Sequence, residues 1–127
     1  MPATVYVDDN GMIVGGRDDG EEYEGVLRGS NDNDVIVGTE DDDRIYGSMG
    51  DDTICGAGGN DELDGGNGQD KLAGEDGEDE LDGGNSQDLL CGHEGDDDLD
   101  AGNSSDQLDG GPGTDSLDAG NGQDICR

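Results

Sequence analysis

The chain has 127 residues, of which 27% are hydrophobic and 2% aromatic, and it contains neither Trp nor Phe. This apolar content is too low for an ordinary globular core. The 36 acidic residues against 5 basic ones give a net charge of -31, which disfavours nucleic acid and anionic membranes as partners and favours cations.

No apolar stretch approaches the ~18 residues that a membrane-spanning helix needs, so we expect no membrane span. Residues 1–6 contain no basic region followed by an apolar run, and no signal peptide is expected there. Three cysteines are an odd number and do not suggest a disulfide framework. Composition alone is typical of an acidic disordered chain, which stays open as an alternative to a chain that folds when its charge is neutralised.

Residues 1–28 are expected to form an N-terminal cap. Two β-prone runs, Thr4–Val7 and Met12–Val14, flank the turn sequence Asp-Asp-Asn-Gly at 8–11, which predicts a β-hairpin. Residues 18–24 follow as an acidic linker. Because stacked repeats need a covered end, we assign this segment the role of a cap over the first coil.

Residues 29–127 consist of eleven consecutive nonapeptides with the pattern G-G/S/T-x-G-x-D-x-L/I-x. A strict short period predicts one small unit stacked many times. Glycines at positions one, two and four permit left-handed or crowded backbone angles. Positions seven to nine are expected to form a short strand, with the aliphatic residue at position eight pointing inward and its neighbours pointing outward.

Position six is Asp in every unit, and these carboxylates are the candidate metal ligands. Two units would form one coil, so alternate aspartates stack in two rows about 4.8 Å apart. The even row contains Asp34, Asp52, Asp70, Asp88, Asp106 and Asp124. The odd row contains Asp43, Asp61, Asp79, Asp97 and Asp115.

The segment Gly65–Ala73, Gly-Gly-Asn-Gly-Gln-Asp-Lys-Leu-Ala, resembles the RTX (repeats-in-toxin, haemolysin-type) calcium-binding nonapeptide. The resemblance covers residues 29–127. It implies an all-β fold, a right-handed parallel β-roll (β-solenoid) with two short-stranded parallel sheets and 18 residues per coil. It also implies Ca²⁺ ions shared by the position-six Asp and the loop carbonyls of two neighbouring coils.

Calcium also suits the residues themselves. Carboxylates repeated at one strand spacing repel each other unless a cation lies between them. Ca²⁺ takes six to eight oxygen ligands from carboxylates and backbone carbonyls, and glycine-rich loops can turn carbonyls inward. With one ion in each gap of the two rows, about nine ions would fit.

Other interpretations fit less well. Mg²⁺ demands near-ideal octahedral geometry, and one His with three scattered Cys cannot form repeated tetrahedral zinc sites. Asp96, Asp98 and Asp100 have EF-hand spacing, but Ala101 and Gln107 replace the required Gly and Glu. The aspartates could instead be loop-closing turn residues only, although turn chemistry does not require Asp in every unit.

Some units depart from the pattern. Asp32 and Asp41 replace the position-four Gly in the first two units; Asp tolerates left-handed angles, and either residue could add a ligand. Ser86 and Ser104 replace the same Gly, so weaker sites are expected there. Cys126 occupies the core position of the last unit, which predicts a frayed C-terminal end.

The two outer faces should differ. The odd face, formed by positions seven and nine of the odd units, is mainly acidic, whereas the corresponding even face is partly apolar. An apolar face usually meets a partner, which could be the hairpin, a neighbouring domain or a second copy of the chain, although scattered apolar surface is common without one. Self-association would use Val35, Val37, Cys55, Ala73, Leu89 and Cys91. Two of these, Cys55 and Cys91, should lie about 9.6 Å apart, too far for a disulfide.

We therefore expect a non-catalytic calcium-binding module without catalytic residues, since nothing pairs a nucleophile with a base. Disorder without calcium and cooperative folding with it are expected. The resemblance implies a secreted, extracellular bacterial protein. No secretion signal follows the repeats, and the chain ends at Arg127 within the last unit, so a fragment or an unusually short member is expected. The alternatives are a structural or adhesive surface-binding module, or the non-catalytic C-terminal part of a larger secreted enzyme or toxin.

Overall fold

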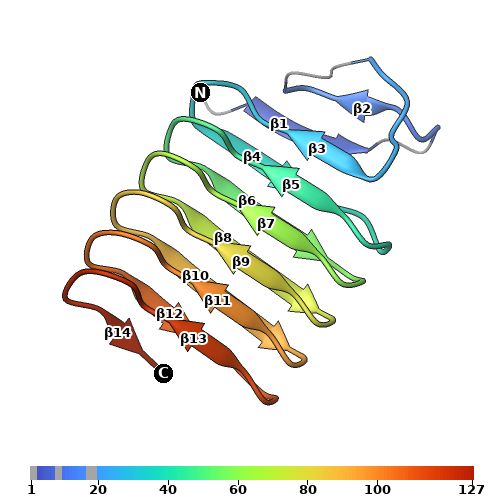
Figure 1. Ribbon diagram of the computed structural model, residues 1–127. Helices are drawn as coiled ribbons and strands as arrows, with labels where there is room; N and C mark the ends of the chain where they lie inside the picture. Colours follow the sequence, from blue (N-terminus) through green and yellow to red (C-terminus); the bar gives the residue numbers. More distant parts are fainter. Residues whose placement is uncertain (1–2, 8–9, 17–19) are drawn as a thin grey trace.

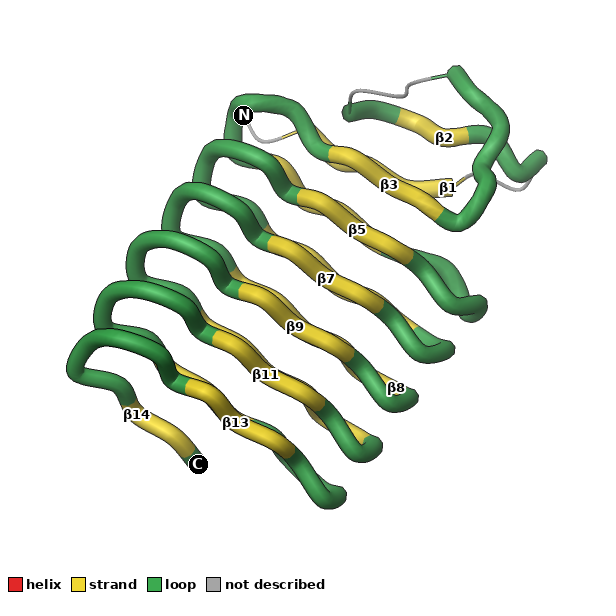
Figure 2. Tube along the Cα trace, in the orientation of Figure 1, coloured by secondary structure: helices red, strands yellow, loops and turns green. Residues whose placement is uncertain are grey.

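The computed structural model describes residues 3–7, 10–16 and 20–127, and all regular structure in them is β. The chain winds as a solenoid in which successive strands from β2 onward alternate between two facing sheets (Figure 1). Loops join the strands at both edges of the roll (Figure 2). The predicted parallel β-roll is confirmed. In the described ranges no helix has the length and apolarity needed to cross a membrane.

The larger sheet has eight strands in the order β14-β12-β10-β8-β6-β4-β1-β2. All its pairings are parallel except that of β1 with β2. Its strands are β1 (Ala3–Val7), β2 (Ile13–Val14), β4 (Asp34–Val37), β6 (Thr53–Ala57), β8 (Lys71–Asp76), β10 (Leu89–Glu94), β12 (Gln107–Asp109) and β14 (Ile125–Cys126).

The second sheet has six strands in the order β13-β11-β9-β7-β5-β3, and all are parallel. Each strand is three residues long, as the repeat predicts for positions seven to nine. The strands are β3 (Val26–Arg28), β5 (Arg44–Tyr46), β7 (Glu62–Asp64), β9 (Glu80–Asp82), β11 (Asp98–Asp100) and β13 (Ser116–Asp118).

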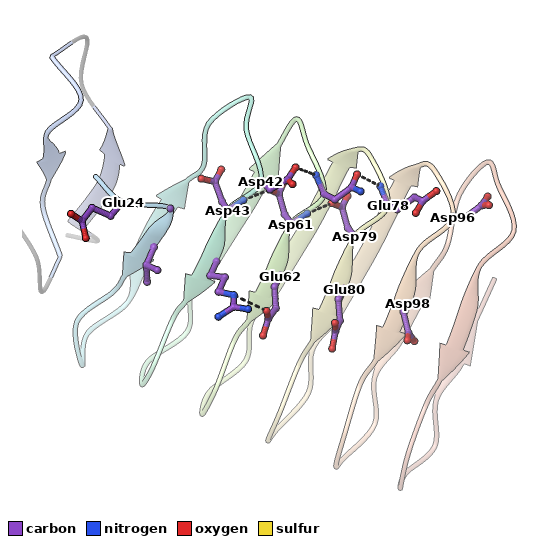
Figure 3. A pocket seen from close by; sticks show the side chains of 14 residues that line it. Glu24, Asp42, Asp43, Asp61, Glu62, Glu78, Asp79, Glu80, Asp96 and Asp98 are labelled. Atoms are coloured by element: carbon purple, nitrogen blue, oxygen red, sulfur yellow. Dashed lines mark hydrogen bonds and ion pairs between the residues drawn. The ribbon is translucent and has the colours of Figure 1, made fainter. Parts of the chain in front are cut away.

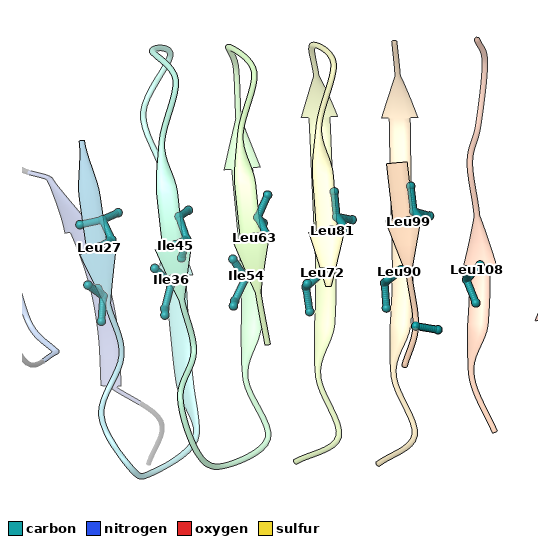
Figure 4. Close-up of a cluster of buried hydrophobic side chains, with 12 residues drawn as sticks. Leu27, Ile36, Ile45, Ile54, Leu63, Leu72, Leu81, Leu90, Leu99 and Leu108 are labelled. Atoms are coloured by element: carbon teal, nitrogen blue, oxygen red, sulfur yellow. The ribbon is translucent and has the colours of Figure 1, made fainter. Parts of the chain in front are cut away.

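Position eight forms the core. Ile54 lies opposite Ile36 on one side and Leu72 on the other, so like positions of successive coils stack in register. The two columns of side chains face each other between the sheets (Figure 4). Full burial of each aliphatic side chain contributes roughly 1.5–3 kcal/mol. The position-eight residues with at most 2% exposure are Ile36, Ile45, Ile54, Leu63, Leu72, Leu81, Leu90, Leu99 and Leu108.

The strands β6, β8 and β10 are longer than three residues. They continue through position one of the next unit to position two or beyond, where Ala57 and His93 both pair with Glu75. A side chain at position two, in place of glycine, accompanies this extension in all three strands.

The N-terminal segment extends the roll. Tyr6 pairs antiparallel with Val14, the pairing expected of a hairpin, while β1 also pairs parallel with β4. Val5 consequently lies opposite Ile36 and is fully buried. The described strands of the hairpin, β1 and β2, extend the edge of the larger sheet and do not cover its even face. The predicted turn residues 8–9 and linker residues 18–19 lie outside the described residues.

Strand β3 was not expected from the sequence. Its central residue Leu27 is fully buried and pairs with Ile45, so β3 is the first strand of the smaller sheet. Val26-Leu27-Arg28 immediately precedes Gly29 and corresponds to positions seven to nine of a unit with Gly25 in place of Asp. The stacked strands of the roll therefore begin one unit before the nonapeptides that contain the position-six Asp.

Candidate metal sites

The position-six aspartates lie where each loop enters the next strand, and stacking brings them together in the two predicted rows. They are buried although they are charged, since the next coil covers each one. Asp115 and Asp124, at the C-terminal end of each row, are only half-buried. The aspartates that are 1–4% exposed are Asp34, Asp43, Asp52, Asp61, Asp70, Asp79, Asp88, Asp97 and Asp106.

One oxygen of each carboxylate from Asp52 onward links two coils. The backbone N–H of Asp34 donates to Oδ1 of Asp52 at 2.8 Å, and that of Asp52 donates to Oδ1 of Asp70 at 2.8 Å. The odd row repeats this bond, for example from Asp43 to Asp61 at 2.8 Å. These bonds give the aspartates a structural role that we did not derive from the sequence.

In the seven of these carboxylates that are buried, the second oxygen has no hydrogen-bond donor. A buried acceptor without a partner costs about 1–3 kcal/mol, and more when it is charged, so these atoms require a proton or a cation. The unpartnered atoms are Oδ2 of Asp52, Asp61, Asp70, Asp79, Asp88, Asp97 and Asp106.

Six of these seven oxygens, all but that of Asp106, lie beside the position-one glycine of their own unit. A Cβ atom placed on Gly47 would lie 2.5 Å from Oδ2 of Asp52 and 2.7 Å from the carbonyl oxygen of Gly65 in the next coil. Glycine at this position leaves the space that the carboxylate occupies. The corner therefore gathers a carboxylate oxygen and a carbonyl oxygen, the hard ligands that Ca²⁺ prefers.

The titration behaviour follows from this burial. Burial raises the pKa of Asp61 and Asp88 to about 7, against the lowering effect of a backbone N–H hydrogen bond. Burial likewise raises the pKa of Asp52, Asp70 and Asp79 to about 6. Neighbouring carboxylates add a smaller increase in every case, so the metal-free corners resist full ionisation.

The loops from Gly47 onward share one backbone conformation. Position two has a positive φ, as in Ser48 at 85° and His93 at 73°, and so does position four, as in Gly50 at 103°. Ser86 and Ser104 adopt this conformation at position four with φ of 84° and 102°, at a steric cost that glycine avoids.

The first two loops differ from the others. Asp32 and Asp41 are exposed and do not have a positive φ, so the expected left-handed position four does not occur there. Oδ2 of Asp34 accepts hydrogen bonds from the Ser30 N–H at 2.5 Å and the Ser30 hydroxyl at 3.0 Å. The sequence signal for these bonds is a Ser or Thr at position two, a residue type that favours local turns, together with Asp in place of Gly at position four.

The second loop repeats this arrangement in the odd row. The Thr39 N–H and hydroxyl donate to Oδ2 of Asp43 at 2.6 Å and 3.1 Å. In both loops the position-two hydroxyl also accepts a hydrogen bond from the position-four N–H. The carboxylates of Asp34 and Asp43 are therefore satisfied from within their own loops.

The two rows have different surroundings. A hollow along the odd row is lined by acidic side chains at positions five and seven (Figure 3). These flanking residues are Asp42, Glu62, Glu78, Glu80, Asp96 and Asp98. Arg44 pairs with Glu62 at 3.1 Å in this hollow. The even row is flanked mainly by neutral side chains such as Gln69, Gln87 and Gln107, so its field attracts cations less strongly.

Side chains alone do not complete a metal site. In the part of the chain that the structure describes, no group of three or more His, Cys, Asp or Glu side chains could hold an ion. Sites along the rows would therefore need backbone carbonyls, as expected for calcium. Cys55, Cys91 and Cys126 are free thiols, and Ala73 separates the first two in the register.

Comparison with known proteins identifies the family of the repeat. The family profile described as the RTX calcium-binding nonapeptide repeat matches in four copies, at residues 28–63, 56–90, 64–99 and 92–126. No curated protein and no solved structure matches the chain. The nonapeptide period, the β-roll and the buried rows of carboxylates are consistent with this match. The chain belongs to the family of RTX calcium-binding nonapeptide repeats.

Proposed function

We propose that this chain is a non-catalytic module that folds when Ca²⁺ binds between successive coils. The eleven position-six aspartates are the proposed carboxylate ligands, together with loop carbonyls of the neighbouring coil. The observation that carries the proposal is the set of seven buried Oδ2 atoms without a donor. A bound divalent ion would supply the positive charge that these oxygens lack.

The dependence of folding on calcium follows from electrostatics. A chain with a net charge of -31 gains little from one inward aliphatic side chain per nonapeptide, and closing the roll stacks its carboxylates at strand spacing. Each site contributes about 2.7 kcal/mol at a calcium concentration one hundred times its dissociation constant. Several sites together provide the difference between a disordered and a folded chain.

Circular dichroism tests this proposal directly. We expect a disordered spectrum in chelator and a cooperative appearance of β signal as Ca²⁺ is added, with Mg²⁺ at equal concentration as the control. Equal β signal in chelator and in calcium would contradict the folding switch.

We further propose a secreted role, on the basis of family membership. A module that stays unfolded at low intracellular calcium and folds outside the cell needs weak sites, with a folding midpoint at about 10⁻⁴–10⁻³ M Ca²⁺. A midpoint far below this range, measured in the same calcium titration, would contradict that role.

Self-association through the even face stays a prediction. Val37 and Leu89 on this face are 38% and 37% exposed, and Ile125 is 54% exposed. Sedimentation of the calcium-loaded chain at high concentration is the test, with Leu89→Asp as the matched variant. A wild-type chain that sediments as a strict monomer would exclude the homodimer.

A further inference from the structure

The first two loops hold their aspartates in a way that competes with a metal ion. Oδ2 of Asp34 receives two hydrogen bonds from Ser30, and Oδ2 of Asp43 receives two from Thr39. In later loops the corresponding oxygen is buried and receives none. The same carboxylate atom therefore has donors in the first two loops and none in the next seven, from Asp52 to Asp106.

Ser48 shows that a hydroxyl at position two is not sufficient. It occupies position two of the third unit, yet Oδ2 of Asp52 has no donor. The backbone of Ser48 is left-handed, with a φ of 85°, and Gly50 at position four has a φ of 103°. The first two units carry Asp32 and Asp41 at position four, and neither their position-two nor their position-four residue has a positive φ. The position-four residue thus separates the two loop types.

We propose that the first two loops are closed by their own Ser and Thr donors and take no Ca²⁺. The roll then binds seven ions, one for each buried Oδ2 without a donor, in place of about nine. Ser30 and Thr39 substitute for the ion, because an incoming cation would have to displace the N–H and hydroxyl donors from the oxygen it needs. This inference rests on the proposed function, since it assigns which of the proposed sites are occupied.

Ion counting by native mass spectrometry at saturating Ca²⁺ tests the inference on the wild-type chain. We expect seven ions. A count of about nine would overturn the inference and leave the proposed function intact. A chain that binds no Ca²⁺ at all would overturn both.

Matched isosteric substitutions locate the occupied sites. Asn at residues 34 and 43 keeps an acceptor oxygen for the Ser and Thr donors, so Asp34→Asn with Asp43→Asn should leave the count unchanged. Asp52→Asn with Asp61→Asn, one coil later in the same rows, should lower the count by about two. A lower ion count in the variant with Asp34→Asn and Asp43→Asn would overturn the inference. If the variant with Asp52→Asn and Asp61→Asn fails to fold, the ion counts of the wild type and of the variant with Asp34→Asn and Asp43→Asn still test the inference.

Conversion of the loops provides the reciprocal test. A variant carrying Ser30→Gly, Asp32→Gly, Thr39→Gly and Asp41→Gly has the later type of loop in both units. It should bind about two more ions than the wild type at saturation. An unchanged count in a folded variant, judged by its β signal in calcium, would contradict the assignment.

Discussion

The first two loops and the later loops carry the same aspartate at the same repeat position, yet they satisfy its charge differently. Ser30 and Thr39 donate to the carboxylates of Asp34 and Asp43, whereas the later loops leave one carboxylate oxygen buried without a donor. The comparison teaches that a repeated aspartate is not by itself a metal site. A cation is needed only where the second carboxylate oxygen has no hydrogen-bond donor.

The largest expected effect is the loss of stability on core substitution, which tests whether the first coil and the middle of the roll share one hydrophobic core. Ile36 lies beside the first loop and Leu72 lies in the middle of the roll, and both are at most 2% exposed. Ile36→Ala and Leu72→Ala should each lower the free energy of unfolding by about 2–5 kcal/mol, measured by chemical denaturation in saturating Ca²⁺. A negligible cost for Ile36→Ala alone would show that the first coil does not pack on the rest.

A smaller effect is expected from pH, because protons can neutralise the buried carboxylates in place of calcium. Burial raises the pKa of Asp61 and Asp88 to about 7 and that of Asp52 to about 6. A carboxyl with a raised pKa stabilises the fold below its unfolded pKa of about 3.9, and this stability is lost as the pH rises through the folded value. In chelator, β signal should therefore increase as the pH falls from about 8 to 5.

The variant Asp52→Asn with Asp61→Asn sharpens this prediction. It removes two of the carboxyls with a raised pKa and should flatten the pH dependence in chelator. A β signal in the wild type that instead grew with rising pH would contradict the proposed cost of ionising the buried rows.

The smallest expected effect separates the two loop types. Ser30→Ala removes the hydroxyl that donates to Asp34 and should cost about 1 kcal/mol in the free energy of unfolding. Ser48→Ala is the matched control and should cost close to nothing, because Oδ2 of Asp52 receives no hydrogen bond from Ser48. Equal costs in denaturation experiments would remove the distinction between the loops.

The period predicted most of the fold. Regular aliphatic residues such as Leu63 and Leu72 predicted the short strands and the core, and Asp at position six predicted the two rows. The period could not predict β3 or the place of Val5 in the core, because neither segment carries the Gly and Asp that mark a unit. Hydrophobic matching of Val5 and Leu27 to the roll determined those positions.

The site was predicted less completely. The sequence predicted that carboxylates stack, but not that the backbone N–H of Asp34 would bond to Asp52 and leave only one oxygen free. It also left open whether Asp32 would adopt a left-handed angle. The loop conformation depends on the backbone at positions two and four together, which residue preferences taken one at a time do not determine.

The most direct test is an anomalous diffraction map from crystals grown in millimolar Ca²⁺. We predict peaks beside Oδ2 of Asp52, Asp61 and the five later aspartates whose buried Oδ2 lacks a donor, and no peak beside Asp34 or Asp43. Crystals in which only water lies beside those seven oxygens would contradict it.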